Sequence, residues 1–223
     1  MIVPVQAATV DRTTAFGNGA DAFVVSNEPN TNFGGSSQIY VKSDPFIVRK
    51  GYLRFDLNLI DKSNISNATL SLTYIDTNNI WNPPPFTYNV YGLNDGNPGE
   101  TWNESTITWN NAPANGGGNT IDSSQSTFLG TFSFNPSSTP YGTIISFSDP
   151  RLVGFLENDT NNLATVIITR NDFDPSTQGF ASPTLQLEIT SPPPVTSVPE
   201  PSSSLGLLSL GVLGIGAALN RKL

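Results

Sequence analysis

Apolar and polar residues alternate with a period of two along several stretches of the chain, a pattern typical of β-strands that bury one face. Leu53, Phe55 and Leu57 fall on one side of such a stretch, and Tyr52 and Arg54 fall on the other. One-sided alternation of this kind, which recurs at 68–74 and 185–189, predicts antiparallel sheets with one face toward solvent. Shorter runs predict further strands at 22–26, 38–42, 87–93, 106–109, 128–134 and 143–147, and the doubly apolar run 164–169 predicts a central strand.

One helix is predicted after these shorter strands. Asp149 and Pro150 supply an N-cap and a proline at the first helical position, an apolar stripe follows, and the helix is expected to end near Asn158. Nine or ten short strands with long loops predict an all-β fold, a two-sheet jelly-roll sandwich with one short helix, plus a C-terminal apolar helix. Its core should hold Leu53, Phe55, Leu70, Leu72, Trp109 and Leu187.

The last 26 residues have a different pattern. Val198-Pro199-Glu200-Pro201-Ser202 precedes an apolar run from Leu205 to Leu219, and Arg221-Lys222 follows. Residues 204–219 form about 24 Å of helix, against a bilayer core of about 30 Å. A core helix of a soluble protein is the alternative, but it needs a polar face, which this run lacks. The pattern predicts a Pro/Ser linker at 191–203 and a transmembrane tail at 204–223.

This segment resembles the PEP-CTERM sorting signal of bacteria that secrete exopolysaccharide. The resemblance implies that an exosortase, a membrane cysteine protease, recognises Pro199, Glu200 and Pro201. It also implies export and transient anchoring through 204–219, followed by release to the cell surface or the extracellular matrix. At the other end, Val5-Gln6-Ala7 is similar to a signal-peptide cleavage site, so residues 1–8 are either the remainder of a signal peptide or an ordinary terminus.

Composition narrows the chemistry available to the chain. Among its 223 residues there is no Cys and no His, which removes disulfides, thiolate metal sites and the commonest general base. The net charge of −8 argues against a nucleic-acid partner. A glycosidase needs two facing carboxylates, and no local motif pairs them here. We therefore expect a protein that is not an enzyme.

Four segments, in order, resemble the DNRLRE family, also described as carbohydrate-binding module family 96. They are Gly19-Ala20-Asp21-Ala22-Phe23-Val24 with 29–34, the stretch 49–57 with 68–70, the stretch 102–113 from Trp102-Asn103-Glu104 to Asn110-Asn111-Ala112-Pro113, and Ser182-Pro183-Thr184-Leu185. The resemblance implies a jelly-roll domain over 9–190 that binds polysaccharide, with anionic uronate polymers as the known ligand type. A basic groove suits such polymers, yet this domain has few Lys and Arg residues.

Candidate carbohydrate contacts are aromatic and basic. Trp81 stands in a polar loop stiffened by prolines, where an indole is either a stacking platform for a sugar ring or an anchor tucked onto the sheet. Tyr52 and Arg54 share the face opposite the core, which is either a binding face or ordinary solvated sheet surface. The full candidate set is Trp81, Tyr40, Tyr52, Lys42, Lys50 and Arg54.

No cofactor is expected apart from Ca²⁺. Asp21, Asn30, Asn32 and Asp56 offer oxygens that suit this ion. The alternative is that these Asn-rich turns bond their own backbone without a metal. The leading hypothesis is an exported, non-catalytic module associated with extracellular polysaccharide. The alternatives are a structural matrix or surface protein without a specific ligand and, more remotely, a polysaccharide lyase.

Overall fold

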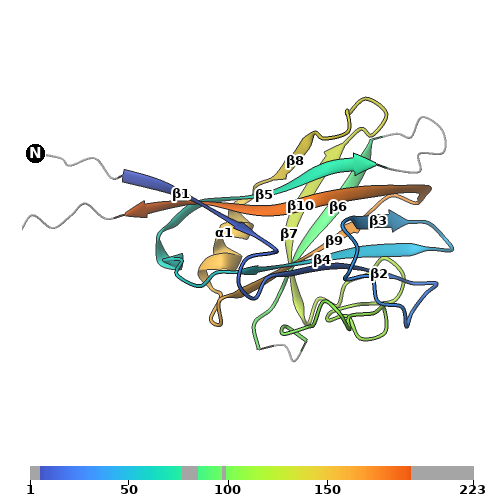
Figure 1. Ribbon diagram of the computed structural model, residues 1–223, viewed down its shortest axis with the longest axis horizontal. Helices are drawn as coiled ribbons and strands as arrows, with labels where there is room; N and C mark the ends of the chain where they lie inside the picture. Colours follow the sequence, from blue (N-terminus) through green and yellow to red (C-terminus); the bar gives the residue numbers. More distant parts are fainter. Residues whose placement is uncertain (1–5, 77–84, 97–98, 192–223) are drawn as a thin grey trace, which may run out of the picture.

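The computed structural model describes residues 6–76, 85–96 and 99–191. Ten strands, one 3₁₀ turn and one helix make up the described chain (Figure 1). The elements are β1 (Gln6–Thr13), β2 (Ala20–Val25), β3 (Ile39–Ser43), β4 (Val48–Asp56), η1 (Lys62–Asn64), β5 (Ile65–Asp76), β6 (Phe86–Leu93), β7 (Ser126–Phe134), β8 (Ile144–Phe147), α1 (Pro150–Glu157), β9 (Leu163–Arg170) and β10 (Asp174–Ser191).

The strands form two antiparallel layers. One layer runs β7-β6-β9-β4, with β2 paired beside β4. The other runs β8-β5-β10, with β1 and β3 sharing the free edge of β10. Strand β3 also pairs with β4 through Lys42 and Ser43, so it joins the two layers at a corner. The predicted all-β sandwich with one short helix is confirmed.

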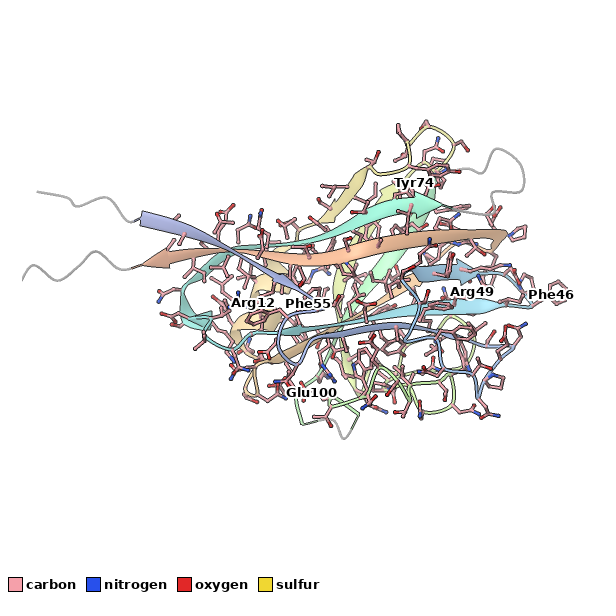
Figure 2. The ribbon with its side chains drawn as sticks, in the orientation of Figure 1. Arg12, Phe46, Arg49, Phe55, Tyr74 and Glu100 are labelled. Atoms are coloured by element: carbon pink, nitrogen blue, oxygen red, sulfur yellow. The ribbon has the colours of Figure 1, made fainter. Side chains whose placement is uncertain are left out.

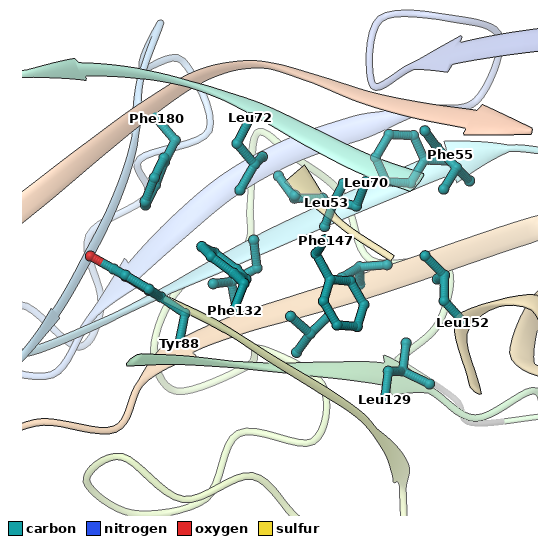
Figure 3. Packing of buried hydrophobic residues seen from close by; sticks show 14 of the residues in the cluster. Leu53, Phe55, Leu70, Leu72, Tyr88, Leu129, Phe132, Phe147, Leu152 and Phe180 are labelled. Carbon is teal, nitrogen blue, oxygen red and sulfur yellow. The ribbon is translucent and has the colours of Figure 1, made fainter. Parts of the chain in front are cut away.

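The main core fills the space between the layers (Figure 3). Leu53 and Phe55 enter it from β4, and Leu70 and Leu72 enter it from β5. Leu187 does so from β10, and all five side chains are buried as predicted. Aromatic rings add directional contacts, such as the stacking of Tyr88 on Phe132 at 4.8 Å. Strand β9, predicted to be central, lies between β4 and β6 and is buried on both faces.

Helix α1 begins and ends where the sequence predicts. Asp149 accepts a hydrogen bond from the Arg151 backbone N–H, and Pro150 occupies the first turn. The helix stops at Glu157 with Asn158 as its C-cap. Leu152 and Leu156 are buried, which fixes the apolar stripe of the helix against the core.

A second apolar cluster lies outside the sandwich, on the face of β4 that the alternation predicts to be wet. The described residues between β6 and β7, 94–96 and 99–125, fold over this face mostly in turns (Figure 1) and are called the 94–125 segment. Trp102 and Ile107 from the segment pack with Tyr52 of β4 and Ile167 of β9. The predicted strand at 106–109 is wrong, because these residues lie in turns and Trp109 packs at the margin of this outer cluster.

The predictions for the two ends of the chain can be compared with the structure only in part. The boundary predicted at residue 8 falls inside β1, whose Gln6 is the partner of Ser191 on β10. The predicted apolar tail, the Pro-Glu-Pro motif and Trp81 lie outside the described residues. Within the described ranges, no helix is both long enough and apolar enough to cross a bilayer.

Candidate functional site

The segment 94–125 forms a polar groove at its junction with the ends of β6 and β7. The groove has a volume of about 600 Å³. Its wall is rich in amide side chains and exposed backbone; the lining residues are Asn94, Asp95, Gly96, Gly99, Asn110, Asn111, Ala112, Pro113, Ala114, Asn115, Ser124 and Gln125. Amides can both donate and accept hydrogen bonds, so this lining can match the hydroxyl groups of a sugar.

Hydrogen bonds fix the groove amides in place. Asn110 donates through Nδ2 to Oδ1 of Asn30 at 2.8 Å. Asn94 accepts at Oδ1 from the Thr127 hydroxyl at 2.7 Å. Each contact uses one atom of the amide and orients the other. The sequence signal for this lining was the Asn110-Asn111-Ala112-Pro113 motif. Its role in a groove was not predicted, because the rest of the lining includes Asn94, Asp95, Gly96 and Gly99.

Lys50 and Tyr52 support the groove from beneath. Lys50 Nζ donates to Asn115 Oδ1 at 2.7 Å and to the carbonyls of Gly116 and Thr120 at 3.1 and 2.6 Å. Tyr52 Oη donates to the Pro113 carbonyl at 3.1 Å. Both side chains have no exposed surface. Lys50 and Tyr52 lie neither on a binding face nor on a solvated sheet surface, because the 94–125 segment covers them.

Burial changes the acid–base behaviour of both groups. It lowers the pKa of the Lys50 ammonium to about 7. It raises the pKa of the Tyr52 phenol, which therefore stays protonated. The Lys50 ammonium also lies 4.8 Å from the centre of the Trp109 ring. Because both side chains are buried, they hold the backbone of the groove wall and cannot contact a ligand in the groove.

Arg54 is a second support for the same segment. Its guanidinium donates to the carbonyls of Asn18 and Trp102 at 2.8 and 2.5 Å and lies 5.0 Å from the Trp102 ring centre. Trp102 itself is buried and donates from its indole N–H to Thr165 at 3.2 Å. Trp102 thus packs against the sheet and does not present its ring to solvent.

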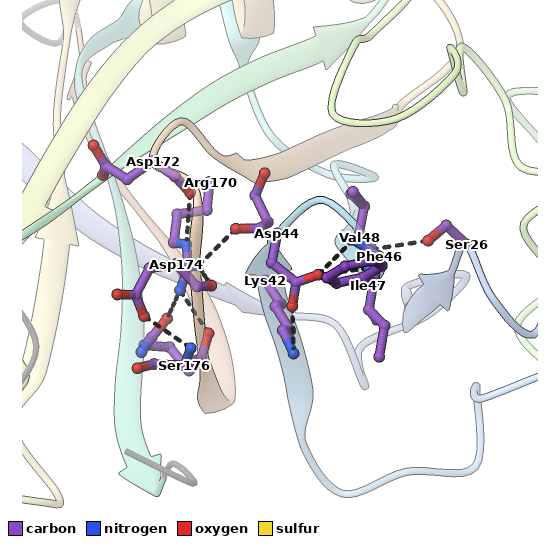
Figure 4. Close-up of polar contacts among 12 residues, drawn as sticks. Ser26, Lys42, Asp44, Phe46, Ile47, Val48, Arg170, Asp172, Asp174 and Ser176 are labelled. Carbon is purple, nitrogen blue, oxygen red and sulfur yellow. Dashed lines mark hydrogen bonds and ion pairs between the residues drawn. The ribbon is translucent and has the colours of Figure 1, made fainter. Parts of the chain in front are cut away.

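Tyr40 and Lys42 lie elsewhere, on β3. Tyr40 is half-buried against Phe23, with Arg49 5.7 Å from its ring centre. Lys42 is almost fully buried and forms a 2.7 Å ion pair with Asp44 (Figure 4). The described members of the candidate set are therefore scattered and largely engaged with the protein, and they do not form one exposed groove. Trp81 stays a prediction.

A separate set of loops carries exposed aromatic rings. Phe46 in the β3–β4 turn is 86% exposed and Phe173 in the β9–β10 turn is 73% exposed. Figure 2 shows Phe46 at the far end of the molecule from β1. Arg170, buried between these turns, donates to the Ser43 carbonyl at 2.9 Å and the Ser176 carbonyl at 2.7 Å (Figure 4). Arg170 thus links the ends of β3 and β10 next to these two turns.

Each of the four predicted calcium ligands forms hydrogen bonds to other parts of the protein. Asp56 accepts from the backbone N–H groups of Asn18 and Asn58, both at 2.8 Å. Asn32 donates to the carbonyls of Glu104 and Ile107, and Asp21 accepts from Thr14. Asn30 bonds Asn110, as described above. The bond from the Asn58 N–H to Asp56 is local, as in the alternative in which turns bond their own backbone, whereas Asn32 and Asn30 bond the distant 94–125 segment.

Comparison with known proteins gives two family matches. Carbohydrate-binding module family 96 matches residues 12–130, which include the whole groove lining. The PEP-CTERM protein-sorting motif matches residues 197–222. No curated protein matches the chain.

Solved structures also match the chain, and one of them is a carbohydrate-binding module. It is described as "Structural basis for the promiscuous specificity of the carbohydrate-binding modules from the beta-sandwich super family". It is 10% identical, with a TM-score of 0.29, and the alignment covers 79% of this chain. This chain spans 55% of the length of that one.

Proposed function

The chain belongs to carbohydrate-binding module family 96, and on that premise we propose that it is a non-catalytic module that binds polysaccharide in the amide-lined groove of 94–125. The observation that carries the proposal is the groove itself. It is large enough for several sugar hydroxyls, its wall is polar, and all its residues lie inside the matched range. Polar groups placed at fixed positions give such sites their specificity.

We further propose that the preferred polysaccharide is neutral or sparsely charged. An anionic polymer needs accessible cations, and the described domain offers few. Lys50 and Arg170 have no exposed surface, and Lys42 is almost fully buried. Lys62 and Arg151 are paired with Asp159 and Asp149. Among the described basic residues, those that are partly exposed and form none of the ion pairs are Arg12, Arg49 and Arg54, so accessible cations are few.

The sorting motif supports an extracellular setting. We propose that an exosortase cleaves the exported chain near its Pro-Glu-Pro motif, and that the released domain associates with extracellular polysaccharide. A structural matrix protein without a specific glycan is the competing function. It differs from the proposal in one measurable respect, namely glycan affinity.

Binding of the full-length chain to the exopolysaccharide of its own producer tests the proposal, by pull-down and by titration calorimetry both in EDTA and with added CaCl₂. Asn110→Ala removes an exposed groove amide and should weaken binding about fivefold, the effect of one hydrogen bond of about 1 kcal/mol. Asn27→Ala is a matched control, because Asn27 is an exposed amide outside the groove. It should bind like the wild type.

Two further variants locate the site. Trp81→Ala tests whether the predicted indole adds stacking, and Phe46→Ala tests the exposed ring of the β3–β4 turn. Loss of binding in Phe46→Ala with normal binding in Asn110→Ala would move the site to that end of the sandwich. Absence of affinity for any glycan would favour the matrix protein.

A further inference from the structure

Three carboxylates meet where the segment 94–125 contacts the turn after α1. Asp95 follows β6, Glu100 precedes Trp102, and Asp159 follows the C-cap of α1. One carboxylate oxygen of each residue lies within 4.8 Å of the others. Figure 2 shows Glu100 on the side of the molecule where the 94–125 segment lies. These residues are distinct from the calcium ligands that the sequence predicts.

Two oxygens of this cluster are buried without a hydrogen-bond partner. They are Glu100 Oε1 and Asp159 Oδ2. Glu100 is only 4% exposed and the Asp159 side chain 1% exposed, so water does not cover these oxygens. A buried carboxylate oxygen without a partner is costly, and a cation or an unseen donor normally satisfies it. This observation is independent of the clustering and points to a bound ligand.

The charge of the cluster is only partly compensated by the protein. Lys62 Nζ lies 2.6 Å from Asp159 Oδ1, which is the other oxygen of that carboxylate. No second ion pair to the cluster occurs among the residues that the structure describes. Three carboxylates therefore face one ammonium group, and a divalent cation would balance the remaining charge.

Local hydrogen bonds hold the carboxylates in position. The Thr160 hydroxyl donates to Asp95 Oδ2 at 2.6 Å. The Asn162 backbone N–H donates to Asp159 Oδ1 at 2.7 Å. A hydrogen bond to one oxygen of each carboxylate also fixes the position of the other oxygen. The turn 159–162 thus orients two of the three side chains before any ion arrives.

We propose that Asp95, Glu100 and Asp159 bind one Ca²⁺ ion. Ca²⁺ bonds carboxylate oxygens at about 2.3–2.6 Å, so oxygens that share one ion lie within about 5 Å of each other. The spacing of the cluster meets this limit. The ion would fasten the start of the 94–125 segment to the turn after α1. Asp95 also lines the groove, so the ion would hold one groove wall, but the site itself requires no glycan.

Calcium binding is measured on the full-length chain after EDTA treatment, with no glycan present. Titration calorimetry with CaCl₂ should give one site, and Ca²⁺ should raise the midpoint of thermal unfolding. Glu100→Gln should weaken Ca²⁺ affinity by about tenfold or more and remove the midpoint shift. Glu188→Gln makes the same chemical change on an exposed position of β10 and should leave both unchanged.

A second variant guards against misfolding of Glu100→Gln. Asp95 is the least buried member of the cluster. Asp95→Asn should also lose the calcium-induced shift of the unfolding midpoint, while the midpoint of its metal-free form stays near that of the wild type. A wild-type chain without a calcium site, or equal affinity in Glu100→Gln and Glu188→Gln, would overturn the proposal. Glycan binding measured separately in EDTA keeps this result apart from that of the groove.

Discussion

Lys50 is a buried lysine whose ammonium group bonds three oxygens of the segment that lines the groove. Its pKa is about 7 in the folded protein against 10.5 ordinarily. Between these values the unfolded chain binds a proton that the folded chain does not. The free energy of unfolding should therefore rise with pH between about 7 and 10.5, by up to about 1.4 kcal/mol per pH unit.

Denaturant unfolding at several pH values checks this expectation. The wild-type curve contains other titrating groups, so the informative quantity is its difference from Lys50→Met. As pH rises above 7, the free energy of unfolding of the wild type should increase relative to that of Lys50→Met. Below pH 7 the difference between the two should stay constant. A difference that does not vary with pH would show that the ammonium keeps its ordinary pKa.

Arg170 is the other cation without exposed surface, and it joins two turns. Its guanidinium reaches the carbonyls of Ser43 and Ser176 and the side chain of Gln178 at 2.7–2.9 Å. Lysine cannot reproduce this planar set of donors. Arg170→Lys should lower the free energy of unfolding by about 3–5 kcal/mol, since buried acceptors lose their partners.

The matched control for that variant is Arg151→Lys. Arg151 is largely exposed, pairs with Asp149 at the start of α1 and lies 5.4 Å from the centre of the Phe128 ring. A small change in the unfolding free energy of Arg151→Lys, beside a large loss in Arg170→Lys, would show that the burial of Arg170, and not the loss of a guanidinium alone, causes the destabilisation. Equal losses in the two variants would contradict the role given to Arg170.

Strand β5 shows how one element divides its side chains between core and solvent. Leu70 is buried between the layers, whereas Thr69 points to the outer face. Leu70→Ala should cost about 2–5 kcal/mol of unfolding free energy, from lost apolar transfer and the cavity left behind. Thr69→Ala should cost far less. Similar losses in chemical denaturation would mean that the register is shifted by one residue.

The alternation of apolar and polar residues predicted these strands, because a strand that buries one face carries an apolar side chain at every second position. The same reasoning failed on β4, where Tyr52 alternates correctly but faces a second cluster instead of water. The cover comes from 94–125, a segment rich in turns and without periodicity, so its docking depends on long-range contacts that alternation cannot show. The strand predicted at 106–109 failed for the same reason.

The candidate site was predicted less well than the fold. Sequence identified Lys50, Tyr52 and Arg54 as important, but exposure decides whether such residues bind a ligand or support a loop, and exposure depends on the covering segment. The acidic cluster joins Asp95 and Glu100 of the 94–125 segment to Asp159 in the turn after α1. No spacing in the sequence relates Asp159 to Asp95, since only the tertiary fold brings them together.

The whole chain carries a sorting signal beyond its folded domain. Residues 197–222 match the PEP-CTERM motif, and we expect cleavage within 198–202. Mass spectrometry of extracellular protein from the producing cells should give a C-terminus in this range. Replacement of Glu200 by Ala should reduce the cleaved form. Secreted, folded protein that still ends at Leu223 would contradict exosortase processing.

Net charge acts on the molecule as a whole and bears on its ligand. The chain has a net charge of −8, and removal of Glu200, Arg221 and Lys222 with the tail makes it −9. Such a domain repels an anionic polymer at long range, while hydrogen bonds and ring stacking act at contact and are largely insensitive to salt.

We therefore expect weak binding to neutral or sparsely charged glycan that changes little between about 0.1 M and 1 M salt, where the screening length falls from about 10 to 3 Å. Titrations of a neutral polysaccharide and of a uronate polymer at both salt concentrations, in EDTA, check this. Trp81→Ala and Asn110→Ala should each weaken the neutral complex. Tight uronate binding that fails at high salt and survives Trp81→Ala would instead require a basic surface, to which Lys42, Lys50 and Arg170 cannot contribute because they are buried within the protein.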